Sequence, residues 1–154
     1  MGLRAQAELF SDLLKKHFSA RLVSVVLFGS VGRGNARPDS DIDLLVVIEG
    51  LPRGRTLRQA MLDPIYDTFA SQGGIAPVNC HLKTPEEAKR ITLMYLDLPT
   101  DGKILFDRDD FFKKILRKVV MRIKKSGAIR KPWGKFYYWD LKPGASTEET
   151  FEIL

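Results

Sequence analysis

Residues 27–44 read LFGSVGRGNARPDSDIDL, and this stretch decides the fold. Before it, Leu22–Phe28 is a short, apolar and largely β-branched run that predicts a buried strand. Gly29–Ser40 is rich in glycine, arginine and other polar residues, which predicts a loop. Ile42–Ile48 is again apolar except for Asp43 and predicts a second strand. A polar, glycine-rich loop between two strands therefore leads into a pair of aspartates.

The two aspartates share one face of the second strand. Side chains alternate between the faces of a strand, so Asp41 and Asp43 point one way while Ile42 and Leu44 point into the core. Two adjacent carboxylates repel each other unless a cation lies between them. Mg²⁺ prefers carboxylate and phosphate oxygens, and a pair of such ions can hold both oxygens of a phosphoryl transfer. The alternative, a turn with capping aspartates, suits Asp39 but not an interior carboxylate, which is costly without a partner.

The loop has the composition of a phosphate-binding turn. Gly29 lacks a side chain, so a phosphate could approach its backbone closely. Ser30 offers a hydroxyl, and Gly32, Arg33 and Gly34 extend the loop and add a cation. The sequence has no Gly-Lys-Ser/Thr of a Walker A loop, and the glycine spacing does not fit a dinucleotide fingerprint. Loop and aspartates together predict a nucleoside triphosphate site.

Gly29-Ser30, ten residues and then an Asp-Ile-Asp run resemble the signature of the DNA polymerase β-like nucleotidyltransferase superfamily. Because no large additional domain is present, the chain is similar to its minimal nucleotidyltransferase branch. The resemblance implies that Gly29 and Ser30 contact the triphosphate, with Arg33 as a further nucleotide-binding candidate. It also implies that Asp41 and Asp43 bind Mg²⁺ and are catalytic. The reaction would be attack of an acceptor hydroxyl on the α-phosphate of an NTP, most simply ATP.

One part of the family pattern is missing. Such enzymes usually carry a third acidic residue on a later strand, and the corresponding run, residues 76–82, has none. Asn79 and His81 share one face by alternation and are the positional candidates. Asn79 can ligate a metal through its carbonyl oxygen, whereas His81 is either a general base or an ordinary strand histidine. Asp97 and Asp101 are further acids that could reach the site from elsewhere.

Charge is concentrated in the last third of the chain. The net charge is +6, and ten basic residues and no acid lie between Phe111 and Trp139. Such a segment attracts RNA or another anionic partner, unless it is a solvated helix face. Residues 133–139 interleave aromatics with this charge, which can serve single-strand binding. For the aromatics we favour the simpler interpretation, a strand packed into the sheet.

The remaining composition narrows the class of protein. Cys80 is the single cysteine, so there is no intrachain disulfide, the expected compartment is the reducing cytoplasm, and a buried thiol is expected. The longest apolar run is too short to cross a bilayer, so no membrane association is expected.

Periodicity and capping signals predict the other elements. The expected helices are residues 3–18, a helix from Thr56 interrupted at Pro64, residues 84–96 behind a capping box, a basic helix capped by Asp109 and closed by Gly127, and a terminal helix capped near 146–149. A single helical turn after Ser30 is also allowed, and the further expected strands are residues 75–82, 103–106 and 136–141.

These elements alternate, which predicts an α/β (α+β) fold with a small mixed sheet flanked by helices. Residues 1–100 are expected to form the nucleotidyltransferase core and residues 101–154 a C-terminal extension of the same domain, with the basic helix and the aromatic strand.

Three functions remain open at this point. Minimal members of the family are often paired with a small helical partner protein and act as antitoxins that nucleotidylate it, so a protein hydroxyl is the first expected acceptor. An RNA end is the second, with residues 113–135 as the RNA-binding segment. The alternative is a non-catalytic module that has lost the third acid and binds a nucleotide or a partner. A homodimer is also compatible with the sequence.

Overall fold

The computed structural model describes residues 1–144. Its larger elements are α1 (Leu3–Phe18), β1 (Leu22–Phe28), α2 (Gly29–Arg33), β2 (Ile42–Ile48), α3 (Arg55–Ala60), α4 (Asp63–Ser71), β3 (Val78–Lys83), α5 (Pro85–Ala88), α6 (Leu98–Asp101), β4 (Lys103–Asp107), α7 (Phe111–Ser126), β5 (Ile129–Trp133) and β6 (Phe136–Asp140). Three short 3₁₀ turns complete it: η1 (Ser19–Arg21), η2 (Leu93–Leu96) and η3 (Arg108–Asp110). The terminal helix expected near 146–149 lies outside the described residues.

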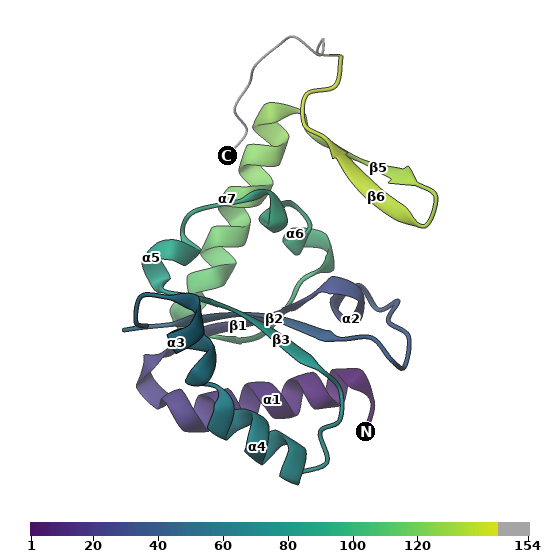
Figure 1. Ribbon diagram of the computed structural model, residues 1–154. Helices are drawn as coiled ribbons and strands as arrows, with labels where there is room; N and C mark the ends of the chain where they lie inside the picture. Colours follow the sequence, from purple (N-terminus) through teal and green to yellow (C-terminus); the bar gives the residue numbers. More distant parts are fainter. Residues whose placement is uncertain (145–154) are drawn as a thin grey trace.

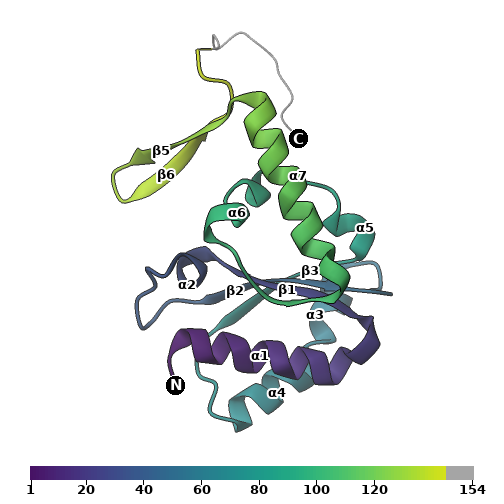
Figure 2. The same cartoon turned by 180° about the vertical axis from the view of Figure 1, so that it is seen from behind.

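A mixed four-stranded sheet forms the centre of the molecule, as predicted. The strand order is β3-β2-β1-β4, in which β1 pairs antiparallel with both β2 and β4 while β2 pairs parallel with β3. Helices cover both faces: α1 and α4 lie on one side, and α5, α6 and α7 on the other (Figures 1 and 2). No helix of the described residues is long and apolar enough to cross a membrane.

The alternation of β2 divides its side chains between two cores. Ile42, Leu44, Val46 and Ile48 pack with α1 and α4, and Leu45 and Val47 pack with α7. Asp43 therefore belongs to the α7 side of the sheet, at the strand end, and is half-buried. The apolar run thus holds the aspartate on a rigid strand whose other residues are fully buried, each contributing roughly 1.5–3 kcal/mol to folding.

Two expected elements are shorter than predicted. β3 begins at Val78 because the backbone N–H groups of Ile75 and Ala76 both donate to Oε1 of Gln6, at 2.9 Å, instead of pairing in the sheet. The helix predicted at residues 84–96 was wrong in its length: the Thr84 capping box forms, but α5 ends at Ala88. Tyr95 donates its hydroxyl to the carbonyl of Ala88 at 2.8 Å, and this bond occupies an acceptor that a continuing helix would need.

The start of α7 also differs from expectation, because Asp109 does not cap it. Asp109 and Asp110 both have positive φ, 53° and 54°. The cap comes from Asp107 at the end of β4, whose carboxylate accepts from the backbone N–H of Phe112 at 2.9 Å and of Lys113 at 3.0 Å. The same carboxylate accepts from the buried Ser24 hydroxyl at 2.5 Å, which ties the helix to β1.

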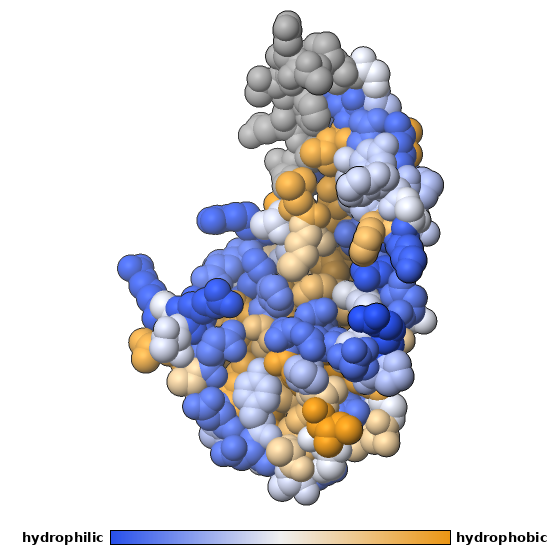
Figure 3. Space-filling view, turned by 45° about the vertical axis from the view of Figure 1, so that its right-hand side comes forward, coloured by the Kyte–Doolittle hydropathy of each residue, from blue (hydrophilic) through white to orange (hydrophobic). Residues whose placement is uncertain are grey.

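The aromatic segment is the largest departure from the predicted packing. It does not join the main sheet: β5, which we did not predict, pairs antiparallel with β6 in a separate hairpin that projects from the body (Figures 1 and 2). Four of its aromatic side chains are exposed by about half or more: Trp133, Phe136, Tyr137 and Tyr138. Figure 3 shows hydrophobic residues at the surface in this upper part of the molecule, among hydrophilic ones.

The hairpin is fastened to the body at its base. Arg130 forms a bidentate bond to the carboxylate of Asp101, at 3.2 and 2.8 Å, and Trp139 donates to Asp97 at 2.8 Å. Arg130 also stacks on Tyr137, with its guanidinium carbon 4.3 Å from the ring centre. Trp139 packs against the α7-side core. The solvent-facing part of the hairpin is thus the part that carries most of its aromatic surface.

Candidate active site

Two carboxylates and one amide meet at the open end of the sheet. Asp43 pairs with Asn79 in the parallel register of β2 and β3, and Asp41 lies just before β2. The Asn79 side-chain nitrogen lies 3.3 Å from Oδ2 of Asp41 and 3.3 Å from Oδ1 of Asp43. Asn79 thus stands at the position where a third acid was expected, close to both carboxylates.

These groups have the chemistry of a Mg²⁺ site. Two carboxylates and an amide oxygen, presented by rotation of the Asn79 amide, are the hard oxygen ligands that Mg²⁺ uses alongside phosphate oxygens and water. Within residues 1–144 no three His, Cys, Asp or Glu side chains come together to hold a metal. A metal held here would therefore depend on two carboxylates and leave several coordination positions for substrate oxygens.

The glycine at the start of α2 is required by this carboxylate pair. Gly29 has a φ of +66°, and a Cβ built on it would lie 2.3 Å from Oδ2 of Asp43. A side chain would therefore displace the aspartate as well as strain the backbone. Ser30 follows in α2 and is half-buried, while Arg33 is exposed at the far end of that turn. α2 is the single helical turn that the sequence allowed, beginning one residue earlier at Gly29.

The other candidates lie in different surroundings. His81 is exposed on the same face as Asn79 and packs edge-on against Phe28, with ring centres 5.3 Å apart. Asp97 and Asp101 do not join the carboxylate pair, because both contact Arg130 and so hold the hairpin. Cys80 is buried, as predicted, and burial raises the pKa of its thiol to about 12, so the sulfur stays protonated and unreactive near neutrality.

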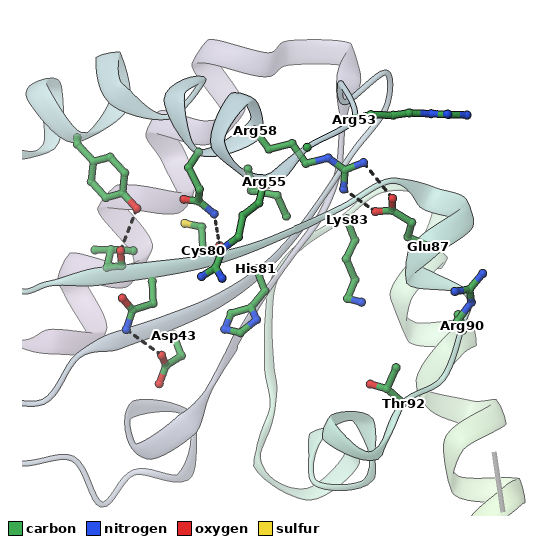
Figure 4. A pocket seen from close by; sticks show the side chains of 16 residues that line it. Asp43, Arg53, Arg55, Arg58, Cys80, His81, Lys83, Glu87, Arg90 and Thr92 are labelled. Atoms are coloured by element: carbon green, nitrogen blue, oxygen red, sulfur yellow. Dashed lines mark hydrogen bonds and ion pairs between the residues drawn. The ribbon is translucent and has the colours of Figure 1, made fainter.

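Beyond Asp43 an open groove of about 1130 Å³ runs along β3, between α3 and α5 (Figure 4). We call it the cationic groove, because five of its lining residues are basic: Arg53, Arg55, Arg58, Lys83 and Arg90. Figure 4 shows His81 and Lys83 pointing into the space from the strand, with Arg90 and Thr92 on its far side. Sequence reasoning missed this cluster, since its members come from three separate segments.

One cation of the groove is neutralised within the protein. Arg58 grips Glu87 with both terminal nitrogens, at 2.7 and 2.9 Å, and donates from Nε to the Pro52 carbonyl at 2.6 Å. The hydrogen bond from Arg58, helped by the N–H of Thr84, lowers the pKa of Glu87 to about 2. The pair joins α3 to α5 across the groove and fixes its width.

The comparisons with known proteins fit this geometry. The family model described as a nucleotidyltransferase domain matches residues 8–126. The chain belongs to this family. The nucleotidyltransferase is also 36% identical over 120 residues to a candidate protein adenylyltransferase of Methanocaldococcus jannaschii, covering 75% of this chain and 80% of that protein. Family membership identifies it as a nucleotide-transferring enzyme.

Solved structures share the fold of this nucleotidyltransferase at low identity. A toxin–antitoxin structure with AMP-PNP aligns with a TM-score of 0.53 and 19% identity, covering 77% of this chain and 87% of that one. A chain in the structure of an AMPylated HEPN toxin of Shewanella oneidensis in complex with an MNT antitoxin aligns with a TM-score of 0.50 and 16% identity, covering 79% of this chain and 87% of that one. At these identities the likeness establishes the fold. The hairpin of β5 and β6 follows the end of the family match.

Proposed function

We propose that the chain is a Mg²⁺-dependent adenylyltransferase that moves AMP from ATP to a hydroxyl of a partner protein. The observation that carries this is the contact set at the sheet end: Asp41 and Asp43 lie together on one face, with Gly29 so close to Asp43 that only glycine fits. The carboxylates supply metal ligands, and the glycine leaves space for phosphate oxygens beside them.

Each residue has a distinct part in the transfer. Asp41 and Asp43, with the Asn79 carbonyl, would hold Mg²⁺, which supplies charge stabilisation at the phosphate oxygens. Gly29 and Ser30 would position the phosphate chain by backbone approach and a hydroxyl contact. The acceptor oxygen attacks the α-phosphorus while the bond to the bridging oxygen of the β-phosphate breaks and pyrophosphate leaves. The acceptor proton goes to His81, on the same face, or to water.

The protein acceptor is supported by the Methanocaldococcus relative, which is named as a protein adenylyltransferase. The fold neighbours include toxin–antitoxin structures, in one of which the toxin is AMPylated. We extend both features to this chain as a proposal: its acceptor is a partner protein of toxin–antitoxin type.

The test is to incubate the protein with Mg²⁺ and ATP labelled at the α-phosphate, together with its candidate partner. We expect label to appear on the partner. The label should be lost with the Asp41→Asn/Asp43→Asn variant and in the presence of EDTA. Arg33 lies at the exposed end of α2 and is the weaker candidate for a nucleotide contact. Arg33→Gln should therefore reduce labelling of the partner less than the double aspartate variant does. Label that persists in the double variant would remove these aspartates from catalysis.

The non-catalytic alternative predicts a different outcome. It follows from the amide at position 79, which cannot act as the usual third acid. If no label forms under any condition while ATP and the partner both bind, the protein is a binding module rather than an active transferase. Binding of a fluorescent ATP analogue and partner copurification provide these two measurements without turnover.

A second candidate function, RNA binding, is favoured by the exposed aromatics of the hairpin. Trp133, Phe136 and Tyr138 share one face of β5 and β6 by register, and the basic residues of α7 precede them. Aromatic faces and cations together suit single-stranded RNA. Binding that weakens steeply with salt and is lost in Trp133→Ser/Phe136→Ser would support it. A flat salt response would exclude it.

A further inference from the structure

We propose that the cationic groove binds an acidic segment of the acceptor protein, beside the hydroxyl that receives AMP. This rests on the proposed function, because it names the feature by which that function selects its acceptor.

The charge of the groove is largely uncompensated. Among the described residues Arg58 is the one of its five cations that forms an ion pair, with Glu87, whose pKa the charge of Lys83 also helps to lower. Arg53, Arg55 and Arg90 are exposed and have no ion-pair partner in residues 1–144, and Lys83 points into the space beside them (Figure 4). Clustered cations repel one another, so a site of this kind gains free energy when an anionic ligand enters.

The groove already holds one carboxylate in the required manner. Glu87 is bound by the two terminal nitrogens of Arg58, in the fork geometry that arginine offers to carboxylates and phosphates. The neighbouring arginines carry the same planar group without such a partner in residues 1–144. A glutamate or aspartate of the acceptor protein could bind one of these arginines in the same way that Glu87 binds Arg58.

The lining favours a peptide over a nucleic-acid strand. Proteins that hold single strands combine cations with aromatic faces on which the bases stack. Two aromatic rings line this groove: Tyr66 is only partly exposed and its hydroxyl donates to the Val78 carbonyl at 2.9 Å, and His81 already packs edge-on against Phe28. The exposed aromatics lie instead on the separate hairpin. The groove therefore offers five cations but, apart from the single imidazole of His81, little surface on which bases could stack.

The position of the groove fixes where the acids must lie. It is lined by β3 from Val78 to Lys83, and Asn79 at its near end pairs with Asp43. The rise from Asn79 to Lys83 is about 13 Å along a strand. Consider an extended acceptor segment whose hydroxyl lies near Asp43. Acidic residues roughly two to five positions before or after the hydroxyl-bearing residue would then lie next to the cations of the groove.

The experiment measures binding without requiring transfer. A fluorescein-labelled peptide with one tyrosine and a run of glutamates next to it is titrated with the protein, in Mg²⁺ and ATP analogue, and compared with its glutamine counterpart. The groove variant is Arg53→Gln/Arg55→Gln/Arg90→Gln. The control variant, with the same loss of charge, is Arg4→Gln/Lys15→Gln/Lys16→Gln on α1, outside the groove.

We expect the acidic peptide to bind more tightly than the glutamine peptide, and the groove variant to lose about tenfold in affinity while the control keeps it. Affinity for the fluorescent ATP analogue should be equal in all three proteins. Equal peptide binding by the groove and control variants would overturn the proposal. So would a matching loss of ATP affinity, which would assign the groove to the nucleotide, or preferential capture of an RNA oligomer over the acidic peptide.

The outcome is separable from that of the proposed function. If the acidic peptide binds in the groove but no acceptor ever takes up label, the proposed function fails while the groove assignment stands. If label passes to a partner at the same rate with the groove variant and with the wild type, the proposed function stands and the groove assignment fails.

Discussion

One amide nitrogen of Asn79 bridges two carboxylates: Nδ2 lies 3.3 Å from Oδ2 of Asp41 and 3.3 Å from Oδ1 of Asp43. The amide therefore relieves the repulsion between the aspartates where a third acid would increase it.

Asn79→Asp should accordingly couple stability to Mg²⁺. In EDTA the third carboxylate adds repulsion, and we expect a loss of roughly 1–2 kcal/mol in the free energy of unfolding. Millimolar Mg²⁺ should restore it, and should stabilise this variant more than the wild type. Asn79→Ser, which brings no charge, is the control. Thermal unfolding of the three proteins with and without Mg²⁺ is the measurement, and an Asn79→Asp protein indifferent to Mg²⁺ would argue against a metal site here.

Gly29→Ala should separate backbone strain from loss of the site. Alanine at φ +66° costs roughly 1–2 kcal/mol, and its Cβ would in addition meet Asp43 at 2.3 Å. We expect nucleotide transfer to fall by about 100-fold or more. Gly34→Ala is the matched control, because φ there is +80° but nothing lies within 4 Å of the added carbon. The two variants should unfold at similar temperatures, but only Gly29→Ala should lose nucleotide transfer. Similar transfer rates in the two variants would contradict the role given to Gly29.

Asp107→Ala should destabilise the protein through three contacts at once. The change removes the acceptor for two N–H groups of α7 and leaves the buried Ser24 hydroxyl without its partner. We expect a loss of about 2–3 kcal/mol in the free energy of unfolding. Asp109→Asn, at the residue that the sequence suggested as the cap, should change stability by less than about 0.5 kcal/mol. Urea denaturation of both variants decides between the two aspartates, and equal losses would contradict the assignment.

Glu87→Gln should alter the acid limb of the stability curve. The pKa of Glu87 is about 2 in the folded protein against an ordinary value of 4.5, so its carboxylate stabilises the fold above about pH 4.5. That contribution is lost as the pH falls toward 2, because the unfolded chain takes up the proton first. The side chain is 44% exposed, so solvent screening limits the effect to less than about 1 kcal/mol.

The measurement is a series of melting temperatures between about pH 2 and pH 7 for the wild type and the variant. We expect the two curves to lie apart above about pH 4.5 and to converge as the pH falls. A constant separation at every pH would show that the Arg58–Glu87 pair does not titrate in this range.

Much of the fold could be predicted because its strands are short apolar runs between strong turn signals. β1 and β2 have the predicted bounds, and the mixed sheet follows from the alternation of elements. β5 was missed because Lys131 and Pro132 interrupt any alternating apolar pattern, and α5 was made too long because nothing local indicates the Tyr95 bond to Ala88. Both depend on contacts between residues that are distant or unpatterned in the sequence.

In the candidate site too, residues that are close together in the sequence could be predicted, and residues that only the fold brings together could not. The aspartates and the glycine lie within one stretch, so strand periodicity and spacing alone are enough to bring them together. The cationic groove depends on Arg53, Lys83 and Arg90 meeting across a strand and two helices. Their charges resemble scattered surface residues in the sequence, and only the parallel pairing of β2 with β3 places β3, and with it the groove, beside Asp43.

Asp101 has two unrelated neighbours. Its backbone oxygen lies where it would be 2.9 Å from a Cβ on Gly32 in α2, and its carboxylate holds Arg130 at the base of the hairpin. A single residue thereby contacts both α2, the turn that we propose binds the phosphates, and the hairpin, which follows the end of the family match. Removing the hairpin would consequently leave Asp101 without Arg130 beside α2, the turn that we propose receives the nucleotide.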